Sequence, residues 1–265
     1  MFKSLSKLLR PQPATPPPSV PPGQRIYAVG DVHGRRDLFD ALIAAIEADD
    51  AVRAPARTTI VLLGDLVDRG PDSAGVIASA RALKARRRVR ILCGNHEEMF
   101  LRCFDDLELF RHFLRYGGRE TILSYPLDQT RWNAADLEEG QAMMREAVPA
   151  DDLAFIRSFE DRAVIGDYCF VHAGIFPGVA IDEQSTNDLR WIREPFLSDS
   201  SDHGFVIVHG HTITDAPVIR SNRIGIDTGA YSSNRLTALA LEGDLRWIIS
   251  TNFSQGVASC DTAPV

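Results

Sequence analysis

This 265-residue sequence lacks several features that mark whole classes of protein. It has no apolar run of the roughly 18 residues that a membrane-spanning helix needs. It also has no excess of positive charge: 29 Lys and Arg stand against 36 Asp and Glu, and the net charge of −7 argues against nucleic acid as the main partner. Only four cysteines occur, without a short paired spacing, so we expect reduced thiols in a cytoplasmic protein rather than a disulfide framework or a zinc finger.

The two ends of the chain differ in composition from its middle. Residues 1–10 mix Leu and Phe with Lys and Arg, and Pro11–Pro22 holds seven prolines in twelve residues, so residues 1–24 are expected to be a basic arm and a stiff tether. Ten residues bury little apolar area, so a free arm is preferred to weak membrane or partner contact. The 45% apolar content predicts one domain over residues 25–250, followed by a loose tail over residues 251–265.

The first part of the chain repeats a strand, a polar loop and a helix. Apolar, β-branched runs predict strands at Arg25–Val29, Thr58–Leu63 and Val89–Cys93. The intervening segments Asp37–Asp49 and Asp72–Arg86 have helical patterns. This repetition predicts parallel strands joined by right-handed crossovers.

The rest of the chain departs from this rhythm. A helical insert is predicted over residues 98–160, with an interruption at Tyr116-Gly117-Gly118. A strand is expected at Tyr168–Val171, and closely spaced short strands after it predict an antiparallel sheet packed on the first sheet. These short strands are Phe205–Val208, Pro217–Arg220, Arg223–Ile226, Leu236–Leu241 and Leu245–Ile249.

A polar cluster follows the Thr58–Leu63 strand. Asp65 and Asp68 are three residues apart, and Arg69 comes next. Open α/β sheets bind their ligands at the carboxyl ends of strands. Carboxylates suit a divalent metal and a guanidinium suits phosphoryl oxygens, so the loop predicts chemistry on a phosphate. Capping of the next helix by the two Asp side chains is the alternative.

Similar loops follow other predicted strands and offer further metal ligands. Asp31 and His33, two apart on an extended chain, point the same way and can share one metal, whereas Asp65 can bridge two. The residues that would complete a second site are Asn95, His172 and His211. A mixed set of carboxylate, imidazole and amide ligands fits manganese, iron or zinc better than calcium or magnesium.

At these motifs the sequence resembles the calcineurin-like metallophosphoesterases, and within them the phosphoprotein phosphatase branch that includes bacterial and phage-type Ser/Thr protein phosphatases. The matching motifs, which extend over Arg25–Ile249, are Gly30-Asp31-Val32-His33-Gly34, Gly64-Asp65-Leu66-Val67-Asp68-Arg69-Gly70, Gly94-Asn95-His96-Glu97, His172-Ala173-Gly174, Trp191-Ile192-Arg193-Glu194, Gly210-His211-Thr212 and Asp227-Thr228-Gly229. Ile213 stands where many other metallophosphoesterases have a second histidine, which favours this branch. Asn234 stands near a position where relatives often have glycine, and Asn can accept a positive φ there.

The resemblance implies a four-layer α-β-β-α sandwich, in which two packed mixed sheets are flanked by helices. It also implies two divalent cations, with Mn²⁺ first and Fe or Zn as alternatives. One cation would be held by Asp31, His33 and Asp65. The other would be held by Asp65, Asn95, His172 and His211. The neighbouring His209 is interpreted as a residue that supports the ligands or as a structural one.

The resemblance further implies a mechanism without a phosphoenzyme. A metal-bridging hydroxide would attack phosphorus in line, while Arg69 and Arg193 neutralise the equatorial oxygens. The Trp-x-Arg-Glu pattern favours Arg193 over the nearby Arg190 for this role. A serine alkoxide is a poor leaving group, so His96, oriented by Asp68, is expected to supply its proton.

The function expected on this basis is that of a metal-dependent phosphomonoesterase acting on phosphoserine and phosphothreonine in proteins or phosphopeptides. One alternative is a symmetrical diadenosine tetraphosphate hydrolase built on the same centre. Those enzymes usually carry Ala at the position of Asp68, because an anhydride leaving group needs less help from an acid. A second alternative is a non-catalytic phosphopeptide-binding protein on the same fold. Because every expected ligand and the acid His96 are present, an enzyme is favoured.

Overall fold

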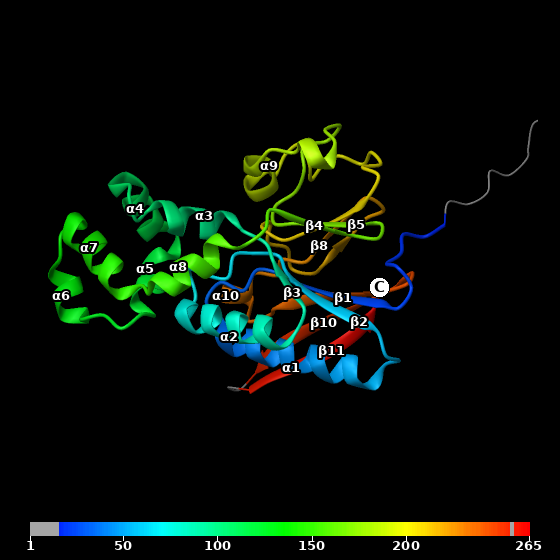
Figure 1. Ribbon diagram of the computed structural model, residues 1–265, viewed down its shortest axis with the longest axis horizontal. Coiled ribbons are helices and arrows are strands. Elements are labelled where there is room, and N and C mark those ends of the chain that lie inside the picture. Colours follow the sequence, from blue (N-terminus) through cyan, green and yellow to red (C-terminus); the bar gives the residue numbers. More distant parts are fainter. Residues whose placement is uncertain (1–15, 255–256) are drawn as a thin grey trace, which may run out of the picture.

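The computed structural model describes residues 16–254 and 257–265 and contains two mixed β-sheets packed face to face (Figure 1). The first sheet has the order β11-β10-β9-β1-β2-β3, and the second has the order β4-β5-β6-β8-β7. The strands of the first are β1 (Gln24–Val29), β2 (Arg57–Leu62), β3 (Val89–Ile91), β9 (Thr237–Glu242), β10 (Leu245–Ser254) and β11 (Val257–Pro264). Those of the second are β4 (Arg162–Ile165), β5 (Tyr168–Val171), β6 (Val206–His209), β7 (Val218–Ile219) and β8 (Arg223–Gly225).

The layers follow from the alternation of side chains along each strand. In β1, Tyr27 belongs to the core under the helices of the first sheet, and Ile26 belongs to the core between the sheets. In β5, Phe170 belongs to the core between the sheets, and Val171 belongs to a third core together with residues of α9 (Thr186–Trp191). The predicted α/β sandwich of two mixed sheets flanked by helices is confirmed.

Two helices of the repeated strand–loop–helix units cover the outer face of the first sheet. They are α1 (Arg36–Val52) and α2 (Ser73–Arg86), close to the ranges that the sequence predicts. Helix α1 buries an apolar stripe of residues spaced four apart, namely Leu38, Leu42 and Ile46. The parallel pairing of β1 with β2 and of β2 with β3 is also as predicted.

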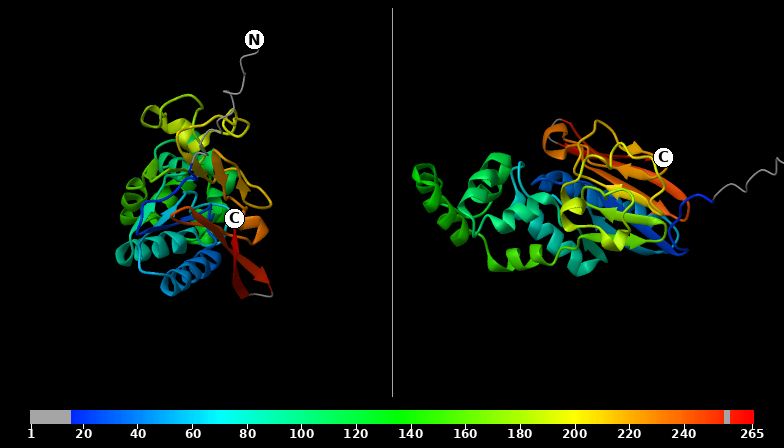
Figure 2. Two further views of the ribbon diagram at one scale, coloured as in Figure 1. Left: turned by 90° about the vertical axis from the view of Figure 1, so that its right-hand side faces the viewer. Right: turned by 90° about the horizontal axis from the view of Figure 1, so that it is seen from above.

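The predicted helical insert projects from one end of the two sheets (Figures 1 and 2). A kink at its Tyr116-Gly117-Gly118 segment, where Tyr116 and Gly117 have non-helical φ and ψ, interrupts the helices, as predicted. The elements of this region are α3 (Asn95–Arg102), α4 (Leu107–Phe113), η1 (Leu114–Gly118), α5 (Arg119–Leu123), α6 (Gln129–Ala134), α7 (Leu137–Ala147) and α8 (Ala150–Arg157). The later short helices are η2 (Ile181–Glu183), α9 and α10 (Ala230–Ser233).

The prediction that the closing strands form one antiparallel sheet is wrong. Strands β6 and β8 run parallel to β5 in the second sheet, whereas β9 and β10 join the first sheet beside β1. The reason lies in the two-sided apolar character of β9, which places Ala238 in the core under the helices and Leu239 in the core between the sheets. A strand that is apolar on both faces takes an internal position in a sheet.

The predicted loose tail is also corrected by the structure. Residues 257–264 form β11, which pairs antiparallel with β10 from Ser254↔Val257 to Trp247↔Pro264. This pairing covers a strand edge that would otherwise present unpaired backbone groups. The sulfur of Cys260 lies 3.7 Å from the carbonyl oxygen of Ala41 in α1, so the strand also contacts the helical layer.

The predicted boundary at residue 24 comes too late in the chain. Val20 is buried in the core between the sheets, and its N–H donates to the carbonyl of Gly243 at 2.9 Å. The hydroxyl of Tyr168 donates to the carbonyl of Pro18 at 3.1 Å. The described part of the predicted tether is therefore attached to the domain, and the arm at residues 1–10 lies outside the described residues.

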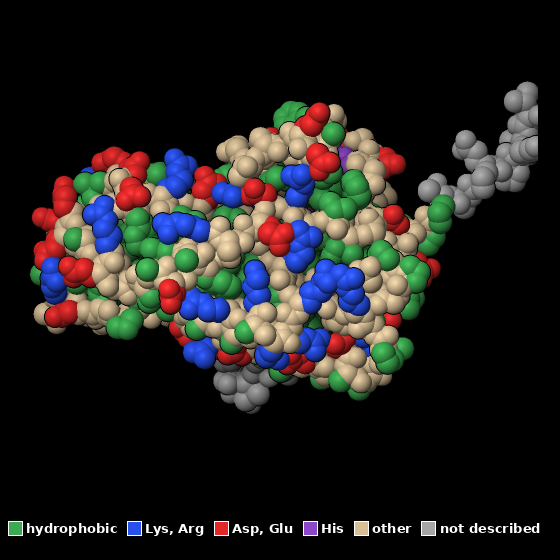
Figure 3. Space-filling view, in the orientation of Figure 1, with side chains coloured by type: hydrophobic (Ala, Val, Ile, Leu, Met, Phe, Trp, Pro, Cys, Tyr) green, Lys and Arg blue, Asp and Glu red, His purple; other side chains and the backbone are tan. Residues whose placement is uncertain are grey.

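The described surface agrees with the charge balance of the sequence. On the face in Figure 3, acidic and basic side chains are interspersed rather than separated by sign. Among the described residues, no helix combines the length and the apolar character that a bilayer span requires. All four cysteines are free thiols, and Cys93, Cys103 and Cys169 are buried.

Candidate metal centre

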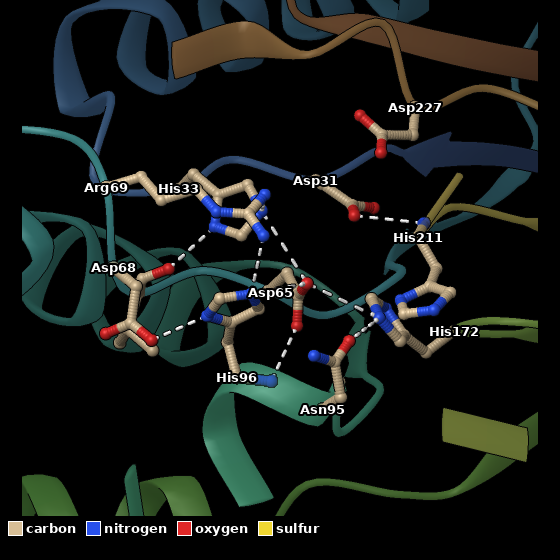
Figure 4. A network of polar contacts seen from close by, with 12 residues as sticks. Asp31, His33, Asp65, Asp68, Arg69, Asn95, His96, His172, His211 and Asp227 are labelled. Atoms are coloured by element: carbon tan, nitrogen blue, oxygen red, sulfur yellow. Dashed lines mark hydrogen bonds and ion pairs between the residues drawn. The ribbon is translucent and has the colours of Figure 1, made fainter. Parts of the chain in front are cut away.

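Loops from both sheets converge on one buried polar cluster (Figure 4). The loops follow β1, β2, β3, β5 and β6, each at the carboxyl end of its strand. In that order they supply Asp31 and His33; Asp65, Asp68 and Arg69; Asn95 and His96; His172; and His211. All of these side chains except that of Arg69 are less than a tenth exposed. The structure thus brings the predicted ligands and most of the predicted catalytic residues together, although their roles stay predictions.

The backbone of this cluster is unusual. Of the six non-glycine residues at positive φ in the described ranges, five belong to the cluster, and they are His33 (45°), Asp65 (50°), Asp68 (72°), Arg69 (67°) and His211 (63°). The sixth is Asn234, at 59°, which agrees with the expectation that Asn accepts a positive φ near that position. Residues other than glycine rarely adopt this conformation, and such strain concentrates at functional sites. The strained backbone conformations therefore occur at the same residues whose side chains form the polar cluster.

Asp65 lies at the centre of the cluster. Its Oδ2 is 3.4 Å from Nε2 of His172, 3.6 Å from Nε2 of His33 and 3.9 Å from Nε2 of His96. Two groups have ligand atoms within 4.8 Å of one another: His33, Asp65 and His96, and Asp65, His172 and His211. Asp65 is shared by both groups, which is the geometry that a bridging carboxylate needs. Placing His96 beside His33 differs from the predicted set, in which Asp31 took that position.

Hydrogen bonds fix which nitrogen of each imidazole faces the cluster. Nδ1 of His33 lies 2.9 Å from the carbonyl oxygen of Val67, and Nδ1 of His172 lies 2.9 Å from that of Leu63. Since a carbonyl oxygen only accepts, each Nδ1 carries the proton, which leaves each Nε2 with a lone pair on the side of the cluster. A backbone partner on the far nitrogen is typical of histidines that bind metals.

The protonation states also suit a metal site. Burial disfavours the cationic imidazole and lowers the pKa of His33, His172 and His211, the last to about 3. Burial alone would raise the pKa of Asp65, but the neighbouring imidazoles of His172 and His96 lower it below its usual range. At neutral pH the cluster therefore presents neutral imidazoles and an ionised carboxylate, which are the metal-binding forms.

Two buried acceptors test whether the residues fit a cation. Asp31 Oδ1 and His211 Nε2 have no hydrogen-bond partner, which is rare and costly for buried polar atoms. Burial and the nearby charges of Asp227 and Asp65 raise the pKa of Asp31, so these carboxylates lack enough positive charge around them. A divalent cation would satisfy both the unpaired acceptors and the clustered carboxylates. The residues present therefore fit divalent cations.

His96 and Arg69 connect the cluster to Asp68. Nδ1 of His96 donates to Oδ2 of Asp68 at 2.6 Å, and Asp68 is completely buried. The guanidinium of Arg69 lies 2.8 Å from Nε2 of His33 and 2.9 Å from Nε2 of His96 (Figure 4). Burial lowers the pKa of His96, but the carboxylates of Asp65 and Asp68 raise it above its ordinary value. The arrangement places a protonatable imidazole beside a fixed positive charge.

The two candidate arginines near residue 190 have different surroundings. The guanidinium of Arg190 lies 2.6 Å from Asp161 and 3.3 Å from Glu98, so it is engaged in structural ion pairs. Arg193 is exposed, and its charge is close enough to His211 to help lower the pKa of that histidine after the larger effects of burial and His172. The charge of Arg190 likewise helps to lower the pKa of His172, so both arginines lie near the cluster and the preference for Arg193 stays a prediction.

The structure also settles two local alternatives from the sequence. Asp72, rather than Asp65 or Asp68, caps α2 by accepting a hydrogen bond from the backbone N–H of Gly75 at 2.8 Å. His209 packs its ring 5.1 Å from that of Phe196 and takes no part in either group around Asp65.

Two buried carboxylates of the site were missed at the sequence level. Glu97 accepts hydrogen bonds from the backbone N–H groups of Asp65 (2.8 Å), Leu66 (2.6 Å) and Gly94 (2.9 Å), so it holds the strained Asp65 loop. Burial, together with the charge of Asp65, raises the pKa of Glu97 to about 7. Asp227 faces Asp31 (Figure 4), and burial raises its pKa to about 6. Both lie in motifs of the resemblance, which is the signal that could have identified them.

An exposed aromatic ring at the edge of the site was also missed. Tyr231 in α10 is 36% exposed, and its ring lies 5.5 Å from that of His33. The guanidinium carbon of Arg69 lies 4.9 Å from the centre of the same ring. The short segment that forms α10 has no pattern that predicts this contact, because the contact depends on how α10 packs against the loops that carry His33 and Arg69.

Comparison with known proteins shows which family and which solved structures this chain is similar to. The model of the family described as calcineurin-like phosphoesterase matches residues 24–251. A structure solved for a candidate diadenosine tetraphosphatase superposes with a TM-score of 0.61 at 20% identity and covers 94% of this chain and 98% of its own. At that identity the superposition shows a shared fold.

Two sequence relatives carry related names but match different shares of the chain. An asymmetrical bis(5'-nucleosyl)-tetraphosphatase of Anoxybacillus flavithermus is 26% identical over 236 residues, which is 80% of this chain and 88% of the relative. A symmetrical bis(5'-nucleosyl)-tetraphosphatase of Acidovorax sp. is 43% identical over 72 residues, which is 27% of this chain and 23% of the relative. The first likeness is lower but extends over most of both proteins.

Proposed function

The chain belongs to the calcineurin-like phosphoesterase family, and from that membership we propose that it hydrolyses the phosphoanhydride chain of dinucleoside tetraphosphates. The observation that carries hydrolysis at this site is the convergence of three imidazoles on the buried carboxylate of Asp65, with the guanidinium of Arg69 against two of them. The choice of substrate is supported by the tetraphosphatase relative that matches 80% of the chain. The sequence alone favoured a phosphoprotein substrate with the dinucleoside tetraphosphate as an alternative, and the proposal reverses that preference.

The proposed cofactor is a pair of divalent cations, with Mn²⁺ as the most effective ion because carboxylate, imidazole and amide ligands are mixed. The residues that would hold them are Asp31, His33, Asp65, Asn95, His172 and His211, with His96 at the edge of the first group. When bound, the cations would supply positive charge to the phosphoryl oxygens and lower the pKa of a water molecule.

The protein's own groups have separate tasks in the proposed reaction. Arg69, whose guanidinium reaches both His33 and His96, donates hydrogen bonds to the oxygens of the phosphoryl group. Arg193 adds positive charge from the side of His211. His96 would give a proton from Nε2 to the leaving oxygen once Arg69, which lies 2.9 Å from that nitrogen, has turned to the phosphoryl group, while Asp68 fixes the orientation of the ring through Nδ1.

A second candidate function is hydrolysis of phosphoserine or phosphothreonine in proteins, and one specific observation favours it. The buried 2.6 Å pair between His96 and Asp68 has the composition of a general acid, an imidazole oriented by a carboxylate. A phosphate leaving group needs little help from an acid, whereas a serine alkoxide needs a proton. The alternative of a non-catalytic phosphopeptide-binding protein is tested by the same experiment as the two enzymes.

A substrate panel distinguishes these functions. Diadenosine tetraphosphate, phosphoserine and phosphothreonine peptides and bis-p-nitrophenyl phosphate would be compared with Mn²⁺, Mg²⁺ and Zn²⁺. We expect kcat/KM for the tetraphosphate to exceed that for the peptides by at least about tenfold, which corresponds to ~1.4 kcal/mol in the transition state. Products ATP plus AMP indicate asymmetrical cleavage, and ADP alone indicates symmetrical cleavage. Faster turnover of the peptides would favour the phosphoprotein phosphatase. If none of the substrates were hydrolysed with any of the metals, the non-catalytic alternative would be favoured.

The pKa of His96 predicts the alkaline side of the pH profile. The carboxylates of Asp65 and Asp68 raise this pKa against the opposing effect of burial, and Asp68, which lies 2.6 Å from Nδ1, keeps its raising effect when cations neutralise Asp65. Hydrolysis of phosphoserine peptides should therefore fall as the pH rises through the raised value. Asp68→Asn removes one of the raising charges, so we expect the falling limb of kcat/KM to move to lower pH by about one unit. Identical limbs for the wild type and Asp68→Asn would exclude this role, and Asp40→Asn on the exposed side of α1 is the control.

A further inference from the structure

The helical insert contacts the catalytic loop at two points that have no role in the reaction described so far. The hydroxyl of Thr121 in α5 donates to Oδ1 of Asp68 at 2.7 Å, although the two residues are 53 positions apart. The carbonyl oxygen of Gly117 accepts from the backbone N–H of Arg69 at 3.0 Å. The insert therefore contacts Asp68, which orients His96, and Arg69, which carries the guanidinium of the site.

Thr121 completes the hydrogen bonding of the Asp68 carboxylate. One oxygen, Oδ2, accepts from His96 at 2.6 Å, and the other, Oδ1, accepts from Thr121. The backbone N–H of Asp68 in turn lies 2.8 Å from the hydroxyl oxygen of Thr121 and 3.0 Å from that of Ser73. All four side chains are nearly or fully buried, so water does not replace these contacts. Thr121 thus binds the backbone and the side chain of a residue held at a φ of 72°.

The close approach of the insert depends on Gly117. This residue has a φ of 103°, and a Cβ placed on it would lie 2.6 Å from the backbone nitrogen of Arg69. Only glycine permits both that conformation and that distance. The Tyr116-Gly117-Gly118 segment therefore does more than interrupt the helices: it lets the insert reach the Arg69 backbone and places α5 over Asp68.

We propose that Thr121 is a positioning residue for the general acid, and that the insert completes the His96–Asp68 pair through it. With Oδ1 bound to Thr121, the carboxylate is held in the orientation in which Oδ2 accepts the Nδ1 proton of His96. The His96 ring then keeps Nε2 toward the leaving oxygen. This inference rests on the proposed acid role of His96, but not on the choice between a dinucleotide and a phosphoprotein.

The test uses two small substrates that differ in their need for an acid. Phenyl phosphate has a poorer leaving group than p-nitrophenyl phosphate, and both report the phosphoester hydrolysis common to the two candidate functions. Thr121→Val keeps the shape of the side chain but removes the hydroxyl. We expect kcat on phenyl phosphate to fall by about tenfold or more, a part of the 10²–10⁴ that a general acid supplies, with KM unchanged. On p-nitrophenyl phosphate the loss should stay within about threefold.

Three further variants separate positioning from packing. Thr121→Ser restores the hydroxyl and should recover kcat on phenyl phosphate, and Thr121→Ala replaces the Val variant if that protein does not fold. Ser124→Ala is the matched control, because the Ser124 hydroxyl accepts from the N–H of Ala74 at 3.0 Å and donates to the backbone carbonyl of Thr121 at 2.6 Å, so it anchors the same helix without touching Asp68. For Ser124→Ala, kcat on phenyl phosphate and kcat on p-nitrophenyl phosphate should change by the same factor. Equal losses on both substrates for Thr121→Val, or no recovery with Thr121→Ser, would overturn the proposal; a changed preference between dinucleotide and peptide would bear only on the proposed function.

Discussion

Replacing Asp65 by Asn is expected to reduce hydrolysis of p-nitrophenyl phosphate by at least about 10³-fold, since loss of the shared charge should remove several kcal/mol of transition-state stabilisation. Asn has the same shape, and its oxygen can still accept from the backbone N–H of His96, as Asp65 Oδ1 does at 3.0 Å. Its amide nitrogen, however, would take the place of Oδ2, which lies 3.4 Å from His172 and 3.6 Å from His33. An N–H group there has no lone pair for a cation and removes the negative charge that both groups share.

Metal analysis and activity should be measured on the same preparations of this variant. We expect the wild type to take up two equivalents of Mn²⁺ and Asp65→Asn to take up clearly less, with the loss of activity following the loss of metal. Asp40→Asn, an exposed carboxylate on α1, is the matched control and should behave like the wild type. Retention of full activity by Asp65→Asn would refute the bridging role, and unchanged metal content with lost activity would place the carboxylate in the chemistry instead.

The sequence predicted the parts of the fold that depend on local patterns. Strands such as Thr58–Leu63 and helices such as Asp72–Arg86 have periodicities that fix their type, and the structure places β2 and α2 there. Pairing between distant strands has no such local signal. Leu236–Leu241 was identified as a strand, but its membership of the first sheet depends on burial of both faces, which a short apolar run does not distinguish from burial of one.

The same limit explains which site residues were found. Asp31, Asp65 and His211 each follow a strand in a recognisable motif, so their convergence could be expected from the sequence. Glu97 acts through backbone N–H groups of the Asp65 loop, and Thr121 reaches Asp68 across 53 residues. The motif that contains Glu97 could have marked that residue, but Thr121 lies outside every motif, and a single sequence carries no pattern for a contact made through tertiary packing.

Replacing His96 by Asn is expected to slow substrates in the order of their need for an acid. Loss of phosphoserine peptide hydrolysis should be about 10²–10³-fold, whereas p-nitrophenyl phosphate, whose phenolate leaves readily, should lose less than about tenfold. Diadenosine tetraphosphate should resemble p-nitrophenyl phosphate, because its leaving group is a phosphate. The physical reason is that an Asn amide can donate to Asp68 as His96 Nδ1 does at 2.6 Å, but it cannot transfer a proton to the leaving oxygen.

The same variant decides between two roles that the geometry allows for His96. Its Nε2 lies 3.9 Å from Asp65 Oδ2 and belongs to one of the two candidate ligand groups, yet its Nδ1 is committed to Asp68. If His96 acts as the acid, His96→Asn keeps the metal content of the wild type and its losses depend on the leaving group. If it is a ligand, the variant loses metal and slows all three substrates alike. The exposed His112, whose ring is tilted against that of Tyr116 at a centroid distance of 4.4 Å, is the matched control, since His112→Asn removes an imidazole from the insert and not from the cluster.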